Sequence, residues 1–403
     1  MESLLTAAYH QLIQALKIET HRFLYHSFNL KNRLTGIVGP RGSGKTTLIL
    51  QYIKEHLYAS NNAFYFTADH IYFNQTSILE FVSKLFNEQG IHYFFIDEIH
   101  KYKNWEQELK NIYDTFPSVY IVFSGSSSLD LIKGSHDLSR RAKLYHLPGL
   151  SFREYLYLQT GMQLDVIALH DLFSDPMSLA AQFSQMPKML GHFKQYLQHG
   201  YYPFYREDED SYYEKVLRVI EKTIYEDIAE YYNLKTENLH YLKKIIGFLA
   251  SIAPGSINTH NIAKNLGIDF KTANNYLIML SETNLIRMLY SKNGGNDILR
   301  KPEKIFLNNT SLLYTLDKMR GIEPPLGNIR ELFLMQSVAD AKYQVFYSEI
   351  GDMIVEGNYL EISGKNKSMS QLNKMNAKGF LVKDDVVASA PNIIPLYYFG
   401  FLY

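Results

Sequence analysis

The stretch GPRGSGKTT has the spacing Gly-x-x-x-x-Gly-Lys-Thr. Glycines let a backbone curl until successive N–H groups point inward at phosphate oxygens. Lys45 would then reach the β- and γ-phosphates of a nucleotide, and the Thr46 hydroxyl would bind Mg²⁺. The alternative is a glycine turn with a chance lysine. We expect phosphate contacts from the whole stretch, namely Gly39, Pro40, Arg41, Gly42, Ser43, Gly44, Lys45, Thr46 and Thr47.

Two adjacent carboxylates end the hydrophobic run YFFIDE. Asp97 is expected to hold Mg²⁺ directly or through water, and Glu98 to polarise an attacking water. A solvated turn is the alternative for such a pair. His100 follows without a second metal ligand at usable spacing, and we interpret it as a sensor-like or structural residue. With the glycine-rich stretch, the pair predicts hydrolysis of a nucleoside triphosphate.

Strands must bring these side chains together. Apolar runs at 33–39, 62–68, 91–98 and 118–127 alternate with helical spacing at 4–16, 45–57, 77–90 and 104–116. This alternation predicts a parallel α/β sheet with helices on both faces. The glycine-rich stretch lies between a strand and a helix, which is the context that phosphate binding requires. Because ligands bind at the carboxyl ends of such strands, the loop and the carboxylate pair should meet there.

Length and composition limit the remaining possibilities. The chain has 403 residues, more than one typical core holds, and its 41 basic and 41 acidic residues balance. It has no cysteine, which excludes disulfides and thiolate chemistry. The first twenty residues lack the basic start of a signal peptide, and no 18-residue apolar run suggests a membrane span. We therefore expect a cytoplasmic protein with no membrane contact.

Five stretches occur in an order that resembles a family of prokaryotic AAA+-like ATPases: GPRGSGKTT, FFIDEIHKYKNWEQELKNIYD, FSGSSS, DLSRRAKLYHLPGLSFREYL and HGYYPFY. Members carry a C-terminal nuclease-like domain of unknown function. The resemblance implies ATP and Mg²⁺ as cofactors and ATP hydrolysis as the activity. It also implies an additional-strand sheet, in which the strand at 118–127 lies between the strands that carry the two nucleotide motifs.

The same resemblance suggests two further site residues. Ser124 and Ser126 match the polar sensor position at the end of a strand. Arg141 matches an arginine that would act as an arginine finger, within its own chain or toward a neighbouring subunit. Arg140 stands where many relatives have glycine, so the choice between the two arginines stays open, and a surface salt bridge is the alternative. The catalytic residues expected are thus Lys45, Glu98, Ser124 and Arg141.

The segment INTHNIAKNLGIDFKTANNYLIML has the spacing of a winged helix-turn-helix, with its turn at Gly267. If it bound DNA, the second helix would present Lys271, Thr272, Asn274 and Asn275 to the bases. Lys264, Lys271 and Arg287 are the only cations of this region, fewer than a strong phosphate contact needs. A structural role, as a lid or protein-contact module, is the alternative.

The C-terminal region resembles the nuclease-like domain of the same family. Asp352 and Glu361 match the two acids of a PD-(D/E)XK metal site, and Glu331 would be an upstream helix carboxylate. Position 363, which should be lysine, is Ser363, and Lys365 comes two residues too late. On a strand this displaces the amine by about 7 Å. We therefore expect a degenerate, inactive nuclease fold.

Together these patterns predict four parts: a P-loop AAA+-like ATPase domain at 1–150, a helical lid or linker at 151–235, a winged helix-turn-helix at 236–300 and a mixed α/β nuclease-like domain at 301–403. The main hypothesis is an ATP-hydrolysing molecular switch, alone, as a homo-oligomer or with a protein partner. The alternatives are an ATP-gated DNA-binding regulator or defence component, and a metal-dependent nuclease.

Overall fold

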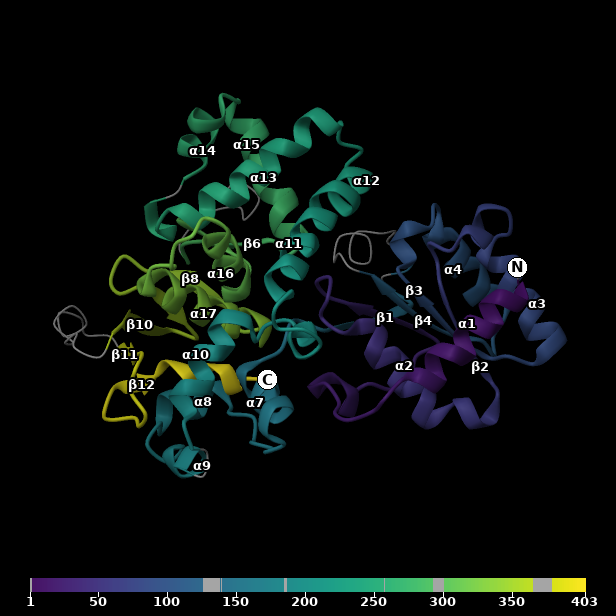
Figure 1. The fold of residues 1–403 in the computed structure, drawn as a ribbon, viewed down its shortest axis with the longest axis horizontal. Coiled ribbons are helices and arrows are strands. Elements are labelled where there is room, and N and C mark those ends of the chain that lie inside the picture. Colours follow the sequence, from purple (N-terminus) through teal and green to yellow (C-terminus); the bar gives the residue numbers. More distant parts are fainter. Residues whose placement is uncertain are drawn as a thin grey trace. The chain divides into compact units, whose positions relative to one another are not determined.

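The computed structural model describes residues 2–125, 138, 140–184, 187–256, 258–292, 301–364 and 379–403. It divides into two compact units, Met1–Gly149 and Leu150–Tyr403, which are treated separately below. Figure 1 identifies the elements of each unit along the chain.

The first unit is built on a five-stranded sheet in the order β2-β3-β4-β1-β5, with every neighbouring pair parallel. β4 lies between β1 and β3, so the additional-strand arrangement expected from the sequence is confirmed. β1 to β4 are almost wholly buried, as befits a sheet covered on both faces, whereas β5 at the side of the sheet is only partly buried. Their bounds are Leu34–Val38 (β1), Ala63–Thr67 (β2), Tyr93–Asp97 (β3), Tyr120–Gly125 (β4) and Ala142–His146 (β5).

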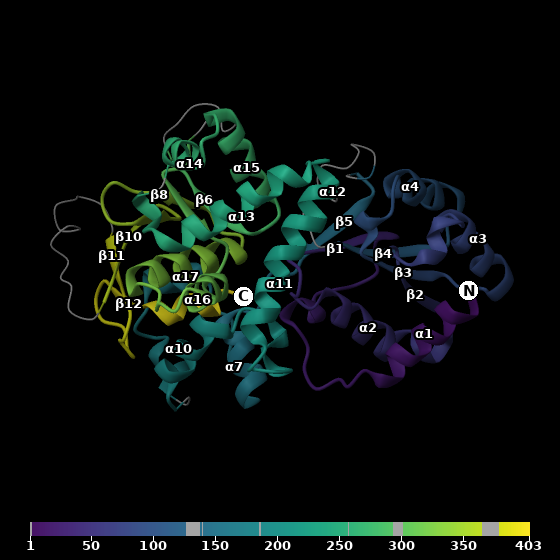
Figure 2. The same ribbon diagram turned by 45° about the horizontal axis from the view of Figure 1, so that its top comes forward.

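Helices cover both faces of this sheet. Figure 2 shows α1 and α2 on one side and α3 and α4 on the other. Ser77 and Glu80 form a capping box that starts α3, so the polar residues just before its apolar run set where the helix begins. The four helices span Glu2–Ala15 (α1), Lys45–His56 (α2), Ile78–Gln89 (α3) and Trp105–Thr115 (α4), and the short 3₁₀ turns span Phe23–His26 (η1), Tyr58–Ser60 (η2), Ile71–Asn74 (η3) and Ile99–Lys101 (η4).

The second unit is helical in its first half and mixed in its second. Its helices are α7 (Phe152–Thr160), α8 (Leu169–Ser174), α9 (Ala180–Ser184), α10 (Met189–His199), α11 (Tyr212–Lys222), the π-helical η6 (Thr223–Ile228), α12 (Ala229–Tyr231), α13 (Thr236–Ser251), α14 (Thr259–Leu266), α15 (Phe270–Glu282), α16 (Thr310–Met319) and α17 (Leu326–Asp340), with the 3₁₀ turns η5 (Pro203–Arg206), η7 (Pro254–Ser256) and η10 (Leu396–Phe401).

A mixed sheet in the order β12-β11-β10-β9-β8 forms the C-terminal part of this unit. β10, β11 and β12 run parallel, and β8, β9 and β10 alternate in direction. The fold class expected from the sequence, a parallel P-loop sheet followed by a helical region and a mixed C-terminal sheet, is therefore confirmed. The strands span Val345–Tyr347 (β8), Met353–Val355 (β9), Asn358–Ser363 (β10), Gly379–Lys383 (β11) and Ile393–Pro395 (β12).

One continuous hydrophobic core joins the helices and the mixed sheet of the second unit. Much of it is tyrosine: six side chains in the first half are fully buried, namely Tyr155, Tyr196, Tyr201, Tyr202, Tyr205 and Tyr212. The high tyrosine content thus serves inter-helix packing, and the hydroxyls of Tyr196 and Tyr201 donate to the Leu150 carbonyl oxygen and to Asn308 Oδ1. The stretches SFREYL and HGYYPFY supply four of these six side chains, namely Tyr155, Tyr201, Tyr202 and Tyr205.

The stretch SFREYL also begins the unit by capping. The Ser151 side chain and the Glu154 side chain form a reciprocal capping box at the start of α7. Ser151 Oγ and Arg153 Nε both donate to the Tyr403 carbonyl oxygen, at 3.0 and 2.9 Å. These polar residues therefore fix the first helix of the unit to its last residues, and none of them lies in the first unit.

α14 and α15 form the expected helix-turn-helix, and a two-stranded antiparallel ribbon follows it, made of β6 (Ile286–Leu289) and β7 (Lys304–Leu307). The apolar positions predicted to face the core are buried or half-buried: Ile262, Ala263, Leu266, Ala273, Tyr276, Leu277 and Leu280. The spacing of apolar residues was thus sufficient to place both helices.

Candidate nucleotide site

The residues expected to bind phosphate and metal lie at one edge of the first sheet. β1, β3 and β4 are parallel neighbours, so their carboxyl ends meet there. β1 leads into the glycine-rich loop, β3 ends at Asp97 and β4 ends at Ser124–Gly125. The sheet order therefore brings together three segments that are separated along the chain.

The glycine-rich loop is tightly folded around the Lys45 side chain. Lys45 is buried, and its Nζ donates to the carbonyl oxygens of Gly39 and Pro40 at 2.9 and 3.0 Å. A Cβ on Gly39 would collide with the Leu147 carbonyl oxygen, so only glycine fits there. Gly44, with φ of 93°, caps α2 in a left-handed conformation that side chains disfavour. Both glycines thus have steric reasons to be glycine.

One buried polar atom of the loop has no hydrogen-bond partner among the described residues. Ser43 is fully buried, and its Oγ is left unpaired there. Such groups are rare in native structures and call for an explanation, such as a ligand that completes them. The loop therefore fits a phosphate, because it combines an unpaired hydroxyl, a lysine ammonium and the N-terminus of a twelve-residue helix.

Arg22 is a contact of this loop that the sequence did not predict. Its side chain is buried and donates from Nη1 to the Ser43 carbonyl oxygen. Its Nη2 donates to the carbonyl oxygens of Pro148 and Gly149, both at 2.9 Å. One guanidinium thus joins the loop to the last two residues of the first unit. No motif marks an arginine that donates to backbone carbonyl groups, so sequence reasoning had no signal for these contacts.

Three side chains converge on the carboxylate of Asp97, which is buried. Thr46 Oγ1 donates to Oδ2 at 2.6 Å, Tyr65 donates to the same oxygen at 3.0 Å, and Ser124 donates to Oδ1. Burial raises the pKa of Tyr65, and the negative charge of Asp97 adds to the rise, so Tyr65 stays a protonated donor. The structure thus brings Thr46, Asp97 and Ser124 together as expected. It adds Tyr65, whose position in a buried strand resembles core packing in the sequence.

Glu98 has an unusual backbone. Its φ of 51° is left-handed, which is uncommon outside glycine and asparagine. Its N–H donates to Asp97 Oδ1 at 3.1 Å and lies 3.4 Å from Ser124 Oγ. Its Oε2 lies 3.4 Å from His100 Nε2 and accepts no hydrogen bond from the described residues. The neighbouring carboxylates therefore differ: Asp97 is held by several donors, whereas Glu98 Oε2 has only the His100 ring beside it and accepts no hydrogen bond from the described residues.

Arg141 lies at the end of the sheet where the strands begin, opposite the end that carries the glycine-rich loop. It immediately precedes β5, whose Ala142 pairs with Leu34 at the start of β1. The glycine-rich loop follows the end of β1, about 13 Å of strand away. Arg141 Nε lies 3.5 Å from Asp114 Oδ1, as in the surface salt bridge given above as the alternative. The geometry does not bring Arg141 to the loop of its own chain, and Ser126 lies outside the described residues.

The second helix of the helix-turn-helix presents part of the expected polar face. Lys271 and Asn275 are exposed, and Asn274 is half-buried. The Thr272 hydroxyl and N–H are both bonded to Asp269, which caps the helix. Thr272 is therefore engaged in capping the helix in this structure. The Asp269 carboxylate beside it also repels an approaching phosphate.

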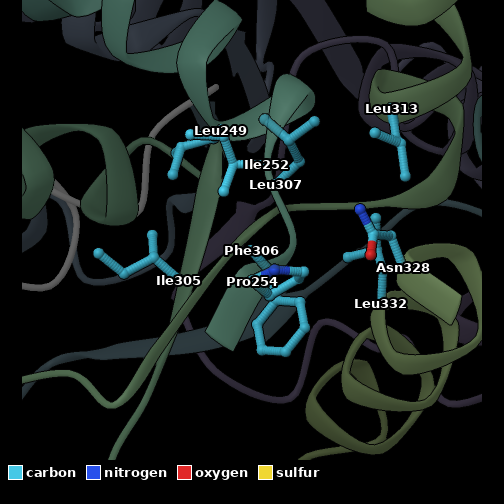
Figure 3. A pocket seen from close by; sticks show the side chains of 9 residues that line it. All are labelled: Leu249, Ile252, Pro254, Ile305, Phe306, Leu307, Leu313, Asn328 and Leu332. Carbon is cyan, nitrogen blue, oxygen red and sulfur yellow. The ribbon is translucent and has the colours of Figure 1, made fainter. Parts of the chain in front are cut away.

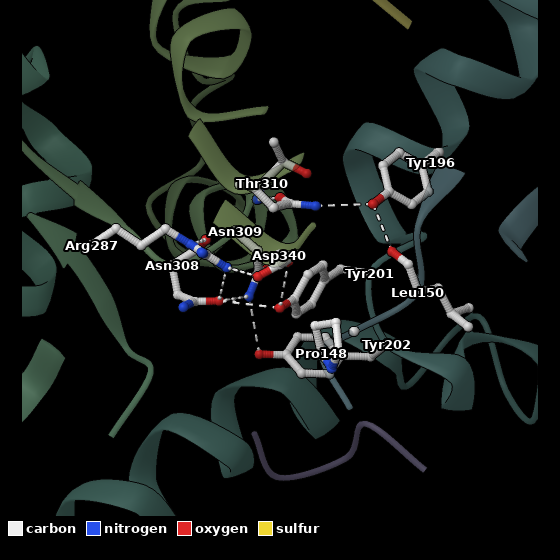
Figure 4. A network of polar contacts seen from close by, with 12 residues as sticks. Pro148, Leu150, Tyr196, Tyr201, Tyr202, Arg287, Asn308, Asn309, Thr310 and Asp340 are labelled. Atoms are coloured by element: carbon white, nitrogen blue, oxygen red, sulfur yellow. Dashed lines mark hydrogen bonds and ion pairs between the residues drawn. The ribbon is translucent and has the colours of Figure 1, made fainter. Parts of the chain in front are cut away.

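Arg287, expected among the cations of that face, is instead paired inside the unit. Its Nη2 lies 2.6 Å from Asp340 Oδ1, and Nε donates to the Asn308 carbonyl oxygen at 2.6 Å. Figure 4 shows this pair within a polar network that includes Tyr201 and Asn309. Arg287 therefore cannot add to a phosphate contact. Counting cations in the sequence overestimated the positive charge on the surface of the helix-turn-helix.

The three carboxylates expected at a nuclease site are also near one another. Glu331 Oε2 lies 2.7 Å and Asp352 Oδ1 3.5 Å from the ammonium of Lys304 at the start of β7. Glu361 is buried on β10, and its charge helps to raise the pKa of Glu331, for which burial is the main cause. Lys365 lies outside the described residues. Lys304 was not predicted as part of this group.

Two hollows occur in the second unit. One of them, drawn in Figure 3, is lined mainly by apolar side chains, among them Ile305 and Leu307 of β7 and Leu332 of α17, and at about 10 Å³ has room for at most one water. Another, of about 210 Å³, is lined by His199, Tyr205, Glu209, Asp210, Tyr212 and Tyr213. In the described parts of the chain, no three or more histidine and carboxylate side chains are arranged to hold a metal ion. Over the same residues, no helix is long and apolar enough to cross a membrane.

Comparisons with known proteins agree with this geometry. Residues 31–156 match a family model described as an AAA domain, and residues 190–323 match a domain of unknown function, DUF8612. The chain is 27% identical over 409 residues to the uncharacterized protein MJ1637 of Methanocaldococcus jannaschii, a match that covers 93% of this chain and 85% of the relative.

Two solved structures are similar to this chain only at low scores. AMPPCP-bound DnaA from Aquifex aeolicus has a TM-score of 0.28 at 15% identity, over 69% of this chain and 88% of that one. PCH-2 of C. elegans has a TM-score of 0.24 at 18% identity, over 38% of this chain and 42% of that one. These scores are too low to assign a function. The sheet order fits a P-loop NTPase fold, and the AAA model matches most of the first unit.

Proposed function

We propose that the first unit binds ATP with Mg²⁺ and hydrolyses it, and that the protein is an ATP-driven molecular switch. The observation that carries the proposal is the convergence of Thr46 and Ser124 on Asp97, beside a loop whose lysine is folded inward. A glycine turn with a chance lysine would have no reason to meet two hydroxyls and a buried carboxylate at a sheet edge.

Each residue has a role that its contacts support. Lys45 would exchange its two carbonyl acceptors for the β- and γ-phosphate oxygens, and the Ser43 hydroxyl would gain a partner. Thr46 and Asp97 would hold Mg²⁺, which when bound would neutralise charge that develops on the phosphates. Glu98, whose Oε2 accepts no hydrogen bond from the described residues, would orient and deprotonate the attacking water. Ser124 would orient the Asp97 carboxylate and act as the polar sensor of the γ-phosphate.

The test separates binding from hydrolysis. Calorimetry with ATP and Mg²⁺ should show binding by the wild type and by Glu98→Gln, and none by Lys45→Ala. Glu98→Gln should lose at least about a hundredfold in turnover, as expected for a general base. Lys54→Ala is the matched control, because Lys54 lies on the same helix but donates to the Leu16 carbonyl oxygen. Equal affinity in wild type and Lys45→Ala would refute the proposal.

Because Arg141 lies at the far edge of its own sheet, its role as an arginine finger requires a neighbouring subunit. A mixture of Arg141→Ala and Glu98→Gln would then regain turnover, since one mixed interface would contain an intact glutamate and an intact arginine. If each variant is inactive and the mixture stays inactive, the proposed finger across an interface is wrong.

DNA binding by the helix-turn-helix is the second candidate function. The observation in its favour is the exposed face of Lys264, Lys271 and Asn275 on α14 and α15. Fluorescence anisotropy with duplex DNA, at two salt concentrations and with ATP, ADP or no nucleotide, tests it. Binding that weakens with salt and is lost in Lys264→Ala/Lys271→Ala supports the role, and no binding in any state excludes it.

A further inference from the structure

The cluster around Lys304 differs from the metal site that its carboxylates suggest. Glu331 on α17, Asp352 just before β9 and Glu361 on β10 are the acids that the sequence pointed to as ligands of Mg²⁺. In the structure, two of them face a single ammonium that comes from β7. That lysine lies 27 residues before Glu331, so it belongs to neither the helix nor the strands that carry the acids.

The ammonium is well placed to neutralise this group. Lys304 is about nine-tenths buried, and its Nζ lies 2.7 Å from Glu331 Oε2 and 3.5 Å from Asp352 Oδ1. The other oxygen of Asp352 accepts the Ile362 N–H at 2.7 Å, which fixes the carboxylate in place. Burial by itself would lower the pKa of Lys304, but the two carboxylates outweigh it and raise this pKa, so the lysine stays charged.

Glu331 and Asp352 together carry one more negative charge than the single ammonium of Lys304 supplies. The charges of Asp352 and Glu361 both add to the rise in the pKa of Glu331 that burial causes, and Lys304 opposes it. Buried charges of one sign are costly unless a cation compensates them. Among the described residues, no set of three acids or histidines is arranged around a metal position. The compensating cation in this structure is therefore the ammonium.

We propose that Lys304 occupies the place of a divalent cation between Glu331 and Asp352. The cluster is then an internal ionic link and not a catalytic metal site. It joins β7, the second strand of the ribbon after the helix-turn-helix, to α17 and to the mixed sheet. Arg287 on β6 makes the matching link to Asp340, the last residue of the same helix.

The two links fix both strands of the ribbon to one helix. Glu331 and Asp340 are nine positions apart on α17, about 13 Å along its axis. Two ion pairs at that separation resist both sliding and rotation of the ribbon. The helix-turn-helix and the mixed sheet consequently move as one body, and a metal ion is not needed to hold them together.

Thermal unfolding of Lys304→Ala, without nucleotide, tests this assignment. In EDTA the variant should melt below the wild type, because the carboxylates of Glu331 and Asp352 lose their cation. Millimolar Mn²⁺ or Mg²⁺ should raise its melting temperature and leave the wild type unchanged, because the vacated position accepts a divalent ion. Lys243→Ala is the matched control, since Lys243 pairs with Glu221 at 2.8 Å on the surface. This control should show neither effect.

A second pair of variants changes the charge of the cluster without any added metal ion. Lys304→Gln should be destabilised, and Lys304→Gln/Glu331→Gln should recover part of the loss because one carboxylate is neutralised. If Lys304→Ala does not fold, this pair decides the question. The proposal is overturned if the wild type gains as much stability from Mn²⁺ as Lys304→Ala, if Lys304→Gln melts like the wild type, or if the double variant is no more stable than Lys304→Gln.

Discussion

The guanidinium of Arg22 donates to the carbonyl oxygen of Ser43, inside the glycine-rich loop, from a position 21 residues upstream. The same side chain donates to Pro148 and Gly149, where the first unit ends. The loop that is proposed to hold phosphate is thus physically joined to the segment that leads out of its unit. A change in loop conformation would alter these shared hydrogen bonds.

We expect Arg22→Lys to weaken ATP binding about tenfold. A single ammonium cannot reproduce the planar fork that serves three carbonyl groups, and tenfold corresponds to about 1.4 kcal/mol, the size of one charge-assisted hydrogen bond. Calorimetry measures this directly. Arg33→Lys is the control, because Arg33 donates to the carbonyl oxygens of Tyr113 and Phe116 at the other edge of the sheet. Equal affinity in both variants would show that Arg22 does not support the loop.

Tyr65→Phe should raise the Mg²⁺ concentration needed for half-maximal ATP hydrolysis by about tenfold. The hydroxyl orients the Asp97 carboxylate, and loss of a residue that orients a metal ligand typically costs ten- to a hundredfold in metal affinity. A magnesium titration of turnover at saturating ATP provides the measurement. Tyr93→Phe should behave like the wild type, since Tyr93 stacks on Tyr120 at the start of its strand. An unchanged magnesium requirement in Tyr65→Phe would contradict this role.

Arg287→Met should lower the free energy of unfolding of the second unit by about 3 kcal/mol. Removal of one partner leaves the Asp340 carboxylate buried without its cation, and this is more costly than the pair itself is stabilising. Urea unfolding gives the difference. Arg218→Met removes an exposed pair with Glu214 and should change stability by no more than about 0.5 kcal/mol. Similar losses of unfolding free energy in the two variants would mean that burial of the ion pair does not determine the cost of removing one partner.

Acid should destabilise the second unit partly through His199. Burial lowers the pKa of His199 below its usual 6.5, while the charge of Glu209 opposes this effect. The unfolded chain therefore binds the proton more readily than the folded one. The contribution of His199 is complete above pH 6.5 and is lost as the pH falls from 6.5 through the lowered pKa.

Melting temperatures of wild type and His199→Gln at pH 7.5 and pH 5.5 reveal this contribution. The variant should lose less stability than the wild type over that interval, because glutamine does not titrate. His170→Gln should follow the wild type, since the His170 side chain is 85% exposed. A steeper acid loss in His199→Gln than in the wild type would reverse the sign and disprove the explanation.

Local sequence patterns were sufficient to predict most of the parallel sheet of the first unit. The strand that ends at Asp97 and the loop that precedes Lys45 were placed from apolar runs and glycine spacing, and the position of β4 followed from the resemblance. Each of these features depends on residues close in sequence or on a motif that recurs in its family. The roles of Glu98 and Arg141 in catalysis stay predictions.

Long-range ion pairs were not predictable from the same patterns. Arg287 resembled a surface cation because Asp340 comes 53 residues later, and Lys304 was overlooked because its partners lie on another helix and another strand. Arg22 binds backbone carbonyl oxygens, which every residue has, so its partners leave no trace in sequence. Residue type and spacing thus indicate which groups do chemistry, whereas the tertiary structure decides which charges are already neutralised.

The contacts of Tyr403 with Ser151 and Arg153 have a consequence for synthesis on the ribosome. The first helix of the second unit packs on η10, and a Cβ on Gly400 would collide with Phe152. The first unit has all of its strands once residue 149 has emerged, so it can fold while translation continues. The second unit cannot close its core until Leu396–Phe401 have been made. For about 250 residues of elongation, its tyrosine-rich helices therefore await their final packing partner.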